Sequence, residues 1–258
     1  MLTGIDHLVI AVPDLDAAIA AYQDLGFRIV RGGRHLVGTH NALVPFADGA
    51  YLELIAFYEP SPAHRWWGPL QRGGGLVDYC LRTDALLADA AAFARGGVPM
   101  DEPVPMVRVR PDGYEVRWRL AIAHEGYRQV APFLIEDETP RAERVPADTA
   151  HPNGATGVRS LTIAVPDVAP VRQWGASAYQ SPGRAIERAD LAAAGVAFTL
   201  GHNGPTLEYV APTSDASPLT DWLRTRGPSP YAAVLATRVA SPAPLDPAKL
   251  CGARLILG

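Results

Sequence analysis

The stretch GIDHLVIAVPD, residues 4–14, decides the fold because a near copy, GVRSLTIAVPD, occupies residues 157–167. Seven of the eleven positions are identical, and in both copies a run of branched apolar residues ends at Pro-Asp. Such a run is typical of a buried strand followed by a turn. His7 is not repeated, and Ser160 stands in its place. The sequence therefore predicts a duplication in which only the first copy keeps the chemistry.

The residues after the first copy predict a β-α-β-β-β unit. Asp14 is expected to cap a helix over residues 15–25, in which apolar residues recur at helical spacing and which Gly26 ends. Strand-like runs follow at 27–30, 38–46 and 51–57, separated by Gly-Gly and Asp-Gly pairs.

A second unit of the same order follows a loop over residues 58–75. We expect a strand at 76–82, a helix from Asp84 as its cap to about residue 94, and strands at 106–110, 114–124 and 130–136. Pro-Asp-Gly at 111–113 indicates a hairpin. Val116, Trp118 and Leu120 alternate with polar positions, which indicates one apolar face on that strand.

Residues 138–156 are polar and proline-rich without a period, which predicts a linker. The chain would then consist of a domain at 1–137 and a degenerate repeat at 157–258. AYLELIAF at 50–57 matches PTLEYVAP at 205–212, so Glu53 and Glu208 correspond. After Thr237 only a proline-rich stretch and a short apolar run remain, so the second repeat is predicted to be truncated.

Composition narrows the class of protein. Hydrophobic residues make up 48% and charged residues 19% of the 258 residues, which is typical of a globular protein. A formal net charge of -4 gives no reason to expect nucleic acid or an anionic membrane as a partner. Two cysteines are too few for a disulfide framework, and no basic leader precedes the first apolar run. We therefore expect a cytoplasmic protein.

With these units in place, the chain resembles the vicinal oxygen chelate superfamily, and within it the glyoxalase-like domains. The resemblance lies in IDHLVIAVPDLDAAIAAYQDLGF at 5–27, GTHNALVPFADGAYLELIAF at 38–57 and PFLIE at 132–136. It implies an α+β fold of tandem βαβββ modules whose mixed sheets form cups. It also implies a divalent metal inside the cup, held by residues of the first and fourth strands of both modules.

The resemblance places His7 and Glu53 at two of these metal positions. An imidazole and a carboxylate suit Zn, Fe, Mn or Ni. The other half of the site is missing, because aligning Asp14 with Asp84 puts Val77 at the position of His7. Aligning the last strands puts Phe133 at the position of Glu53. A slip of one residue offers Asp78, and a longer shift offers Glu136.

The sequence contains further candidate residues besides His7 and Glu53. Glu53 lies in an otherwise apolar strand and, without a metal, is expected to serve as a general base. Parity lets only one of His40 and Asn41 face the cup, and His40 is our choice for catalysis or a third ligand. The candidate substrate contacts are Asn41, Trp118 and Asp78. We assign no functional role to the histidines of the glycine-rich and proline-rich loops, which are His35, His64, His151 and His202.

Three readings of function follow. The first is an enzyme that acts on a small oxygenated metabolite with possible help from one divalent metal, as an isomerase, lyase or dioxygenase. The second is a metal-free protein that binds or sequesters a small molecule, of the bleomycin-resistance type. In the third, the second repeat is structural and forms a homodimer. No nucleotide cofactor is expected, because no glycine-rich loop precedes a helix at phosphate-loop spacing.

Overall fold

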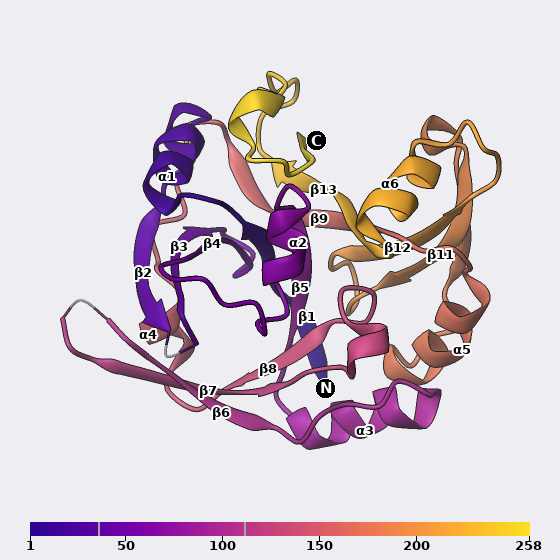
Figure 1. The fold of residues 1–258 in the computed structure, drawn as a ribbon, viewed down its shortest axis with the longest axis horizontal. Coiled ribbons are helices and arrows are strands. Elements are labelled where there is room, and N and C mark those ends of the chain that lie inside the picture. Colours follow the sequence, from indigo (N-terminus) through magenta and orange to yellow (C-terminus); the bar gives the residue numbers. More distant parts are fainter. Residues whose placement is uncertain (36, 111) are drawn as a thin grey trace.

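The computed structural model describes residues 1–35, 37–110 and 112–258. Its strands form two β-sheets (Figure 1). The first sheet, here called the closed sheet, joins eight strands in the order β1-β4-β3-β2-β6-β7-β8-β5. The long antiparallel pairing of β1 with β5 and a short pairing of β2 with β6 connect its two modules. Its strands are β1 (Leu2–Ala11), β2 (Val30–His35), β3 (Thr39–Pro45), β4 (Tyr51–Phe57), β5 (Gly75–Thr83), β6 (Val104–Val109), β7 (Glu115–Ala121) and β8 (Phe133–Asp137).

The second sheet has six strands in the order β10-β11-β12-β9-β13-β14. Its strands are β9 (Ala155–Ala164), β10 (Arg184–Arg188), β11 (Ala193–Thr199), β12 (Thr206–Pro212), β13 (Ser229–Thr237) and β14 (Leu255–Leu257). The helices are α1 (Leu15–Asp24), α2 (Trp67–Gln71), α3 (Leu86–Gly96), α4 (Arg141–Arg144), α5 (Ala169–Ala178) and α6 (Pro218–Arg226). The predicted α+β class with modules of curved sheet and a shorter second copy is confirmed.

The sequence predicted the N-cap residue of α1 correctly but not that of α3. Asp14 caps α1, because its Oδ1 accepts the amide hydrogen of Ala17 at 2.9 Å. Asp84 does not cap α3; it pairs with the N-terminal amine, and Ala85 is the N-cap residue. Aligning Asp14 with Ala85 instead places Asp78, not Val77, at the position of His7.

Other differences concern residues without a clear period. The predicted strand at 27–30 is wrong, since β2 begins at Val30 and includes the Gly-Gly pair. The loop at 58–75 contains α2, and the linker at 138–156 contains α4. Residue 111 of the predicted Pro-Asp-Gly hairpin lies outside the described residues, but β6 and β7 pair as antiparallel neighbours. No helix among the described residues is long and apolar enough to span a membrane.

The two sheets share one hydrophobic core. This core includes Leu8 of β1 and Tyr79 of β5 on the outside of the closed sheet, and Leu161 and Tyr209 of the second sheet. The hydroxyl of Tyr209 lies 2.6 Å from that of Tyr79 and 2.7 Å from that of Tyr179. Helices α3 and α5 also pack side by side (Figure 1). The sheets are therefore joined by continuous packing and not only by the chain between them.

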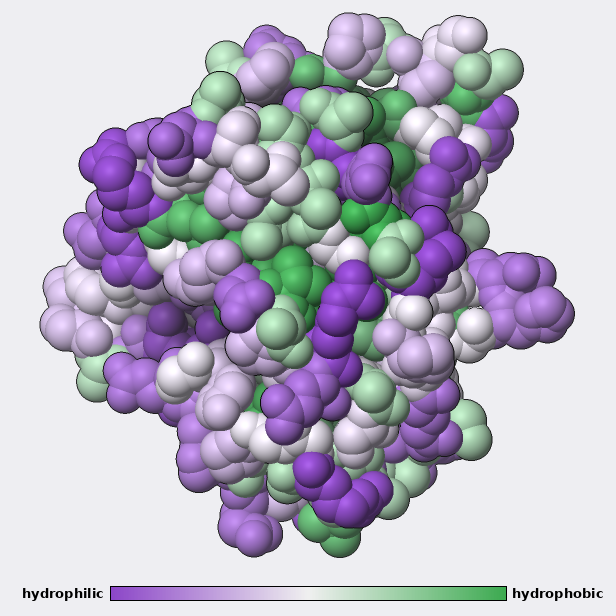
Figure 2. All heavy atoms as spheres, turned by 90° about the vertical axis from the view of Figure 1, so that its right-hand side faces the viewer, coloured by the Kyte–Doolittle hydropathy of each residue, from purple (hydrophilic) through white to green (hydrophobic). Residues whose placement is uncertain are grey.

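The concave faces of the two sheets are filled differently. Inside the closed sheet a separate apolar cluster contains Val9, Trp118 and Phe133. On the second sheet, Leu219 and Trp222 of α6 pack against β9, β12 and β13 and occupy the corresponding face. The outer surface on this side mixes hydrophilic residues with small hydrophobic areas (Figure 2). Helix α6 thus fills the face of the second sheet that it covers, whereas the described residues leave a cavity inside the closed sheet.

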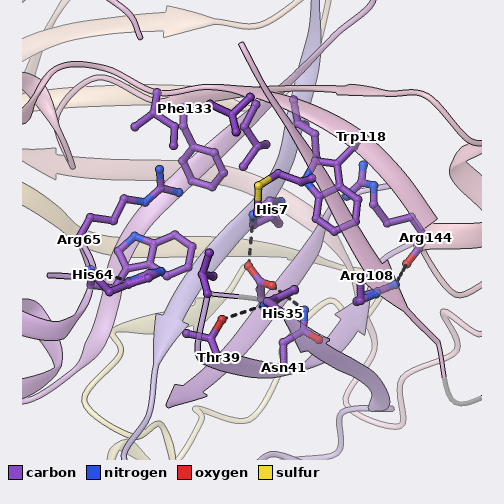
Figure 3. Close-up of a pocket in the computed structure, with 18 of the residues that line it drawn as sticks. His7, His35, Thr39, Asn41, His64, Arg65, Arg108, Trp118, Phe133 and Arg144 are labelled. Carbon is purple, nitrogen blue, oxygen red and sulfur yellow. Dashed lines mark hydrogen bonds and ion pairs between the residues drawn. The ribbon is translucent and has the colours of Figure 1, made fainter. Parts of the chain in front are cut away.

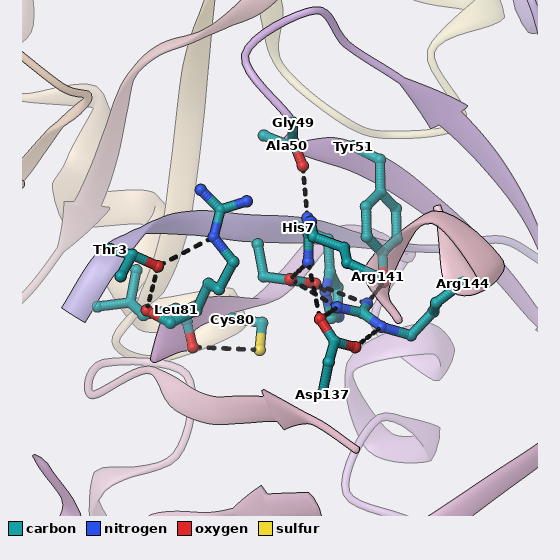
Figure 4. Close-up of polar contacts among 12 residues, drawn as sticks. Thr3, His7, Gly49, Ala50, Tyr51, Cys80, Leu81, Asp137, Arg141 and Arg144 are labelled. Atoms are coloured by element: carbon teal, nitrogen blue, oxygen red, sulfur yellow. Dashed lines mark hydrogen bonds and ion pairs between the residues drawn. The ribbon is translucent and has the colours of Figure 1, made fainter. Parts of the chain in front are cut away.

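Helix α4 is bound to the closed sheet by a buried ion network (Figure 4). Arg144 donates to both oxygens of Asp6, at 2.9 and 2.8 Å, and it also pairs with Asp137. Arg141 pairs with the same two carboxylates. Burial raises the pKa of Asp6, but Arg144 and the neighbouring His7 outweigh it and hold this pKa well below 3.8. The segment predicted as a linker therefore packs against the closed sheet through ion pairs with Asp6 of β1 and Asp137 of β8.

Replacing Asp6 should show how much this network contributes to stability. Asp6→Asn removes the buried carboxylate shared by the buried Arg144 and the partly exposed Arg141 and leaves them only Asp137, and we expect the free energy of unfolding to fall by about 3–5 kcal/mol. Urea denaturation measures this loss. The difference from the wild type should be equal at pH 7 and pH 5, because a carboxylate with a lowered pKa loses its stabilisation only as the pH falls through its folded pKa, below 3.8.

The matched control is Asp190→Asn, which removes an exposed carboxylate paired with Arg188. Its effect should be at most about 1 kcal/mol. An Asp6→Asn variant as stable as this control would contradict a stabilising role for the buried network.

Candidate functional site

A cavity of about 370 Å³ lies inside the closed sheet (Figure 3). This volume is within the range of sites for small molecules. Apolar and aromatic side chains form most of its wall, and polar and charged side chains lie among them. The polar residues that line it are His7, His35, Thr39, Asn41, Glu53, His64, Arg65, Arg108, Arg128 and Arg144. These residues come from both modules of the closed sheet, so the cavity exists only when the modules are paired.

Glu53 is the central polar group of the cavity. Its carboxylate is 6% exposed, accepts a hydrogen bond of 2.6 Å from Asn41 Nδ2 and lies 3.4 Å from His7 Nε2. Burial raises the pKa of Glu53, but His7 and His35 in their protonated forms and the amide of Asn41 outweigh it. The pKa of Glu53 therefore lies below its usual value of 4.5. At neutral pH the cavity thus holds an ionised carboxylate.

His7 is held in one orientation by three neighbours. Its Nδ1 lies 2.7 Å from Asp6 Oδ1, the ring stacks on Tyr51 at 4.7 Å, and Phe133 meets it edge-on at 5.3 Å. An ionised carboxylate at Nδ1 keeps the proton of the ring on that atom. The Nε2 atom is therefore the one directed at Glu53. The structure brings His7 and Glu53 together as the resemblance implied.

Our choice between His40 and Asn41 was wrong. His40 points out of the closed sheet toward Tyr58, and Asn41 points inward to Glu53. Asn41 has space because β2 carries Gly32 beside it: a Cβ on Gly32 would lie 2.0 Å from Asn41 Oδ1. Both faces of β3 are apolar around these residues, so the sequence contained no alternation that could decide the parity.

Two histidines that we assigned to loops line the cavity. His35 ends β2, and its Nδ1 lies 2.9 Å from Thr39 Oγ1. Burial lowers the pKa of His35, and burial lowers the pKa of His64 to about 4. Both rings are therefore neutral at pH 7. A strand with two adjacent glycines gave no periodic signal for His35, and no sequence pattern marked His64.

Of the remaining candidates, Trp118 lines the cavity and Asp78 does not. Asp78 is buried behind Trp66, whose Nε1 donates to it at 2.8 Å, and Arg65 lies 3.5 Å away. Burial raises the pKa of Asp78. Phe133 lines the cavity at the position that matches Glu53. The second module therefore contributes aromatic walls and cations in place of ligands.

The donor atoms present do not fit a preformed metal site. His7 Nε2 and Glu53 Oε2 are close enough to meet one ion, but two donors are too few. The three donors found within 4.8 Å of one another among the described residues belong to Asp6, His7 and Cys80. Asp6 is occupied by two arginines, and burial raises the pKa of the Cys80 thiol well above its usual range. A thiol that keeps its proton and a carboxylate held by cations are poor ligands.

The second copy has no comparable group. Glu208 forms a 2.6 Å ion pair with Arg188 from β10 and accepts a hydrogen bond from Thr162. Its charge is therefore neutralised by the protein itself. With Ser160 in place of the histidine and α6 over the concave face, this sheet keeps the packing positions of the repeat but not its site.

Comparison with known proteins agrees with this architecture. A family model described as a glyoxalase-like domain matches residues 5–179. The chain belongs to this glyoxalase-like family. The resemblance to the vicinal oxygen chelate superfamily is thereby confirmed, whereas a search of curated proteins gives no match.

Solved structures with the same fold are distant in sequence. A protein from Staphylococcus aureus described as hypothetical is 14% identical, with a TM-score of 0.74 over 99% of this chain and 98% of the other. A mutant of 4-hydroxymandelate synthase from Streptomyces coelicolor is 13% identical, with a TM-score of 0.64 over 92% of this chain and 71% of the other. At these identities the likeness concerns the fold alone.

Metal analysis tests the donor argument directly. Protein purified without chelator or added metal should contain less than about a tenth of an equivalent of any transition metal by elemental analysis, because the site lacks a third available donor. His7→Ala should leave this content unchanged. About one equivalent of a single metal in the wild type, lost in His7→Ala, would contradict this prediction.

Proposed function

We propose that this glyoxalase-like protein is an enzyme that transfers a proton at a carbon next to a carbonyl group of a small oxygenated metabolite. The reaction takes place in the cavity of the closed sheet, and Glu53 is the general base. The observation that supports this proposal is an ionised carboxylate held by Asn41 and His7 at the end of a cavity with apolar walls. Isomerases and lyases are the reaction classes that begin with this step.

The reactivity of Glu53 depends on its surroundings. A carboxylate of low pKa is a weak base in water, but an apolar ligand that displaces water from the cavity removes solvation from its charge. Its pKa then rises toward the range in which a carboxylate accepts a proton effectively. Asn41 holds one carboxylate oxygen, so the other, which faces His7, is the oxygen that takes the proton.

The neutral His35 is suited to stabilise the negative charge that develops on the carbonyl oxygen when the proton is removed. His35 has its Nδ1 at Thr39, and no described residue bonds to its Nε2, which remains available to a ligand. A neutral imidazole can donate a hydrogen bond to the oxygen on which charge develops and does not compete with Glu53 for the proton. We infer that His35 stabilises the enolate oxygen, a role that resembles that of an oxyanion hole.

The second candidate function is metal-free binding without chemistry. The aromatic walls favour it, because Trp66, Trp118 and Phe133 surround the cavity and suit an apolar ligand. In that case the carboxylate of Glu53 would serve only to orient the ligand.

Homodimer formation also stays a prediction. Among the described residues, β10 and β14 are the edge strands of the second sheet, and an edge strand can pair with a second copy of the chain.

Hydrogen exchange distinguishes an enzyme from a binding protein. The wild type is incubated in D2O with small aldehydes, ketones and 2-oxo acids, and proton NMR follows the loss of signals next to the carbonyl. We expect accelerated exchange in at least one compound, and a rate at least about 100-fold lower in Glu53→Gln because the amide cannot accept the proton. Asn41→Ala should reduce the rate less, by about tenfold, because it only frees the carboxylate to move.

Glu208→Gln is the matched control, since it changes the corresponding residue of the second sheet and should leave exchange unaffected. Wild-type exchange in Glu53→Gln would exclude Glu53 as the base. Tight binding of a compound without any exchange across the set would favour the binding protein instead.

A further inference from the structure

The arginines around the cavity differ in how their charges are compensated. Arg144 pairs with Asp6 and Asp137, and Arg65 lies 3.5 Å from Asp78. Arg108 has no carboxylate within 4.0 Å among the described residues, although it is only 5% exposed. A buried guanidinium without a counter-ion is costly, so an anion that reaches it binds favourably.

The contacts of Arg108 leave part of its guanidinium free. Its Nη2 donates to the backbone oxygen of Arg144 at 3.0 Å, and its Nε has no hydrogen-bond partner. Arg108 lies on β6 opposite His35 of β2, where the two modules meet, and its head group lines the cavity (Figure 3). Glu53 is the acidic residue that lines the same cavity, and its carboxylate lies beside Asn41 and His7 and forms no ion pair with Arg108.

The remainder of the cavity is apolar. Trp118, Leu120 and Ile135 line the wall contributed by β7 and β8. At the opposite side the guanidinium of Arg65 is stacked over Trp66 and Phe133, at 4.4 and 4.3 Å from the ring centres. These surfaces suit a hydrocarbon or aromatic body, and they offer it few polar partners.

We propose that Arg108 anchors the carboxylate of the substrate, so that this enzyme acts on a small amphiphilic carboxylic acid whose apolar body lies against Trp118. This inference rests on the proposed function, because it assumes that the cavity is the substrate site. One guanidinium matches one carboxylate in charge and in planar geometry. A phosphate ester carries nearly two charges and would meet repulsion from the ionised Glu53 in the same cavity.

Binding of acids and their amides tests the role of Arg108. The probes are three pairs of equal shape, namely phenylacetate and phenylacetamide, 3-phenylpropionate and its amide, and hexanoate and its amide. Calorimetry or quenching of tryptophan fluorescence measures their dissociation constants up to about 10 mM. We expect at least one acid to bind about tenfold or more tightly than its amide, since a charge-assisted hydrogen bond is about twice as strong as a neutral one.

Variants assign this preference to one side chain. Arg108→Gln should abolish it, with acid and amide bound equally within about threefold, and Arg108→Lys should keep part of it because the charge remains. Arg117→Gln, on the outer face of β7, is the matched control and should keep the full preference. Thermal unfolding shows whether each variant is folded. If Arg108→Gln is unfolded, the acid preference of Arg108→Lys tests the role of Arg108 in its place.

The outcomes separate this inference from the proposed reaction. No acid binding in the wild type, no preference over the amides, or a preference that survives in Arg108→Gln would overturn the carboxylate site. Glu53→Gln should keep the preference for acids, because it removes a negative charge from the cavity. If the preference depends on Arg108 while Glu53→Gln exchanges protons at the wild-type rate, the reaction is wrong and the carboxylate site stands.

Discussion

A series of contacts between charged and polar side chains connects helix α4 to the cavity. Arg144 holds Asp6, Asp6 holds His7, and His7 faces Glu53. Each contact fixes the ionisation or orientation of the next group, so Glu53 stays ionised although it is only 6% exposed. The arrangement also connects the architecture to the site, because Arg144 reaches Asp6 only when α4 lies on the closed sheet.

The sequence was sufficient to predict the parts of the site that belong to single strands. His7 and Glu53 could be placed because each lies within a long apolar run that matched a known family pattern. The parts that depend on contacts between distant segments could not be predicted. Arg144 lies 138 residues from Asp6, and nothing in a polar, proline-rich stretch indicates that its arginines become buried.

The errors had similar physical causes. The choice of His40 over Asn41 was wrong because β3 is buried along almost its whole length, so no alternation of apolar and polar residues marked the inward face. Val77 was aligned with His7 because Asp84 resembled a helix cap, whereas Thr83 and Ala85 form the start of α3. In both cases the local residue preference was reasonable, and tertiary contacts determined a different result.

The cluster of Tyr79, Tyr179 and Tyr209 has a consequence for how the two copies diverge. The hydroxyls of Tyr79 and Tyr209 meet across the boundary between the sheets, and both sheets belong to one apolar core, so loss of the second copy would expose the apolar outer side of the first. Ser160, which stands where the first copy has His7, does not belong to this shared core. The second copy therefore contributes to the first sheet through packing, whether or not it binds a ligand of its own.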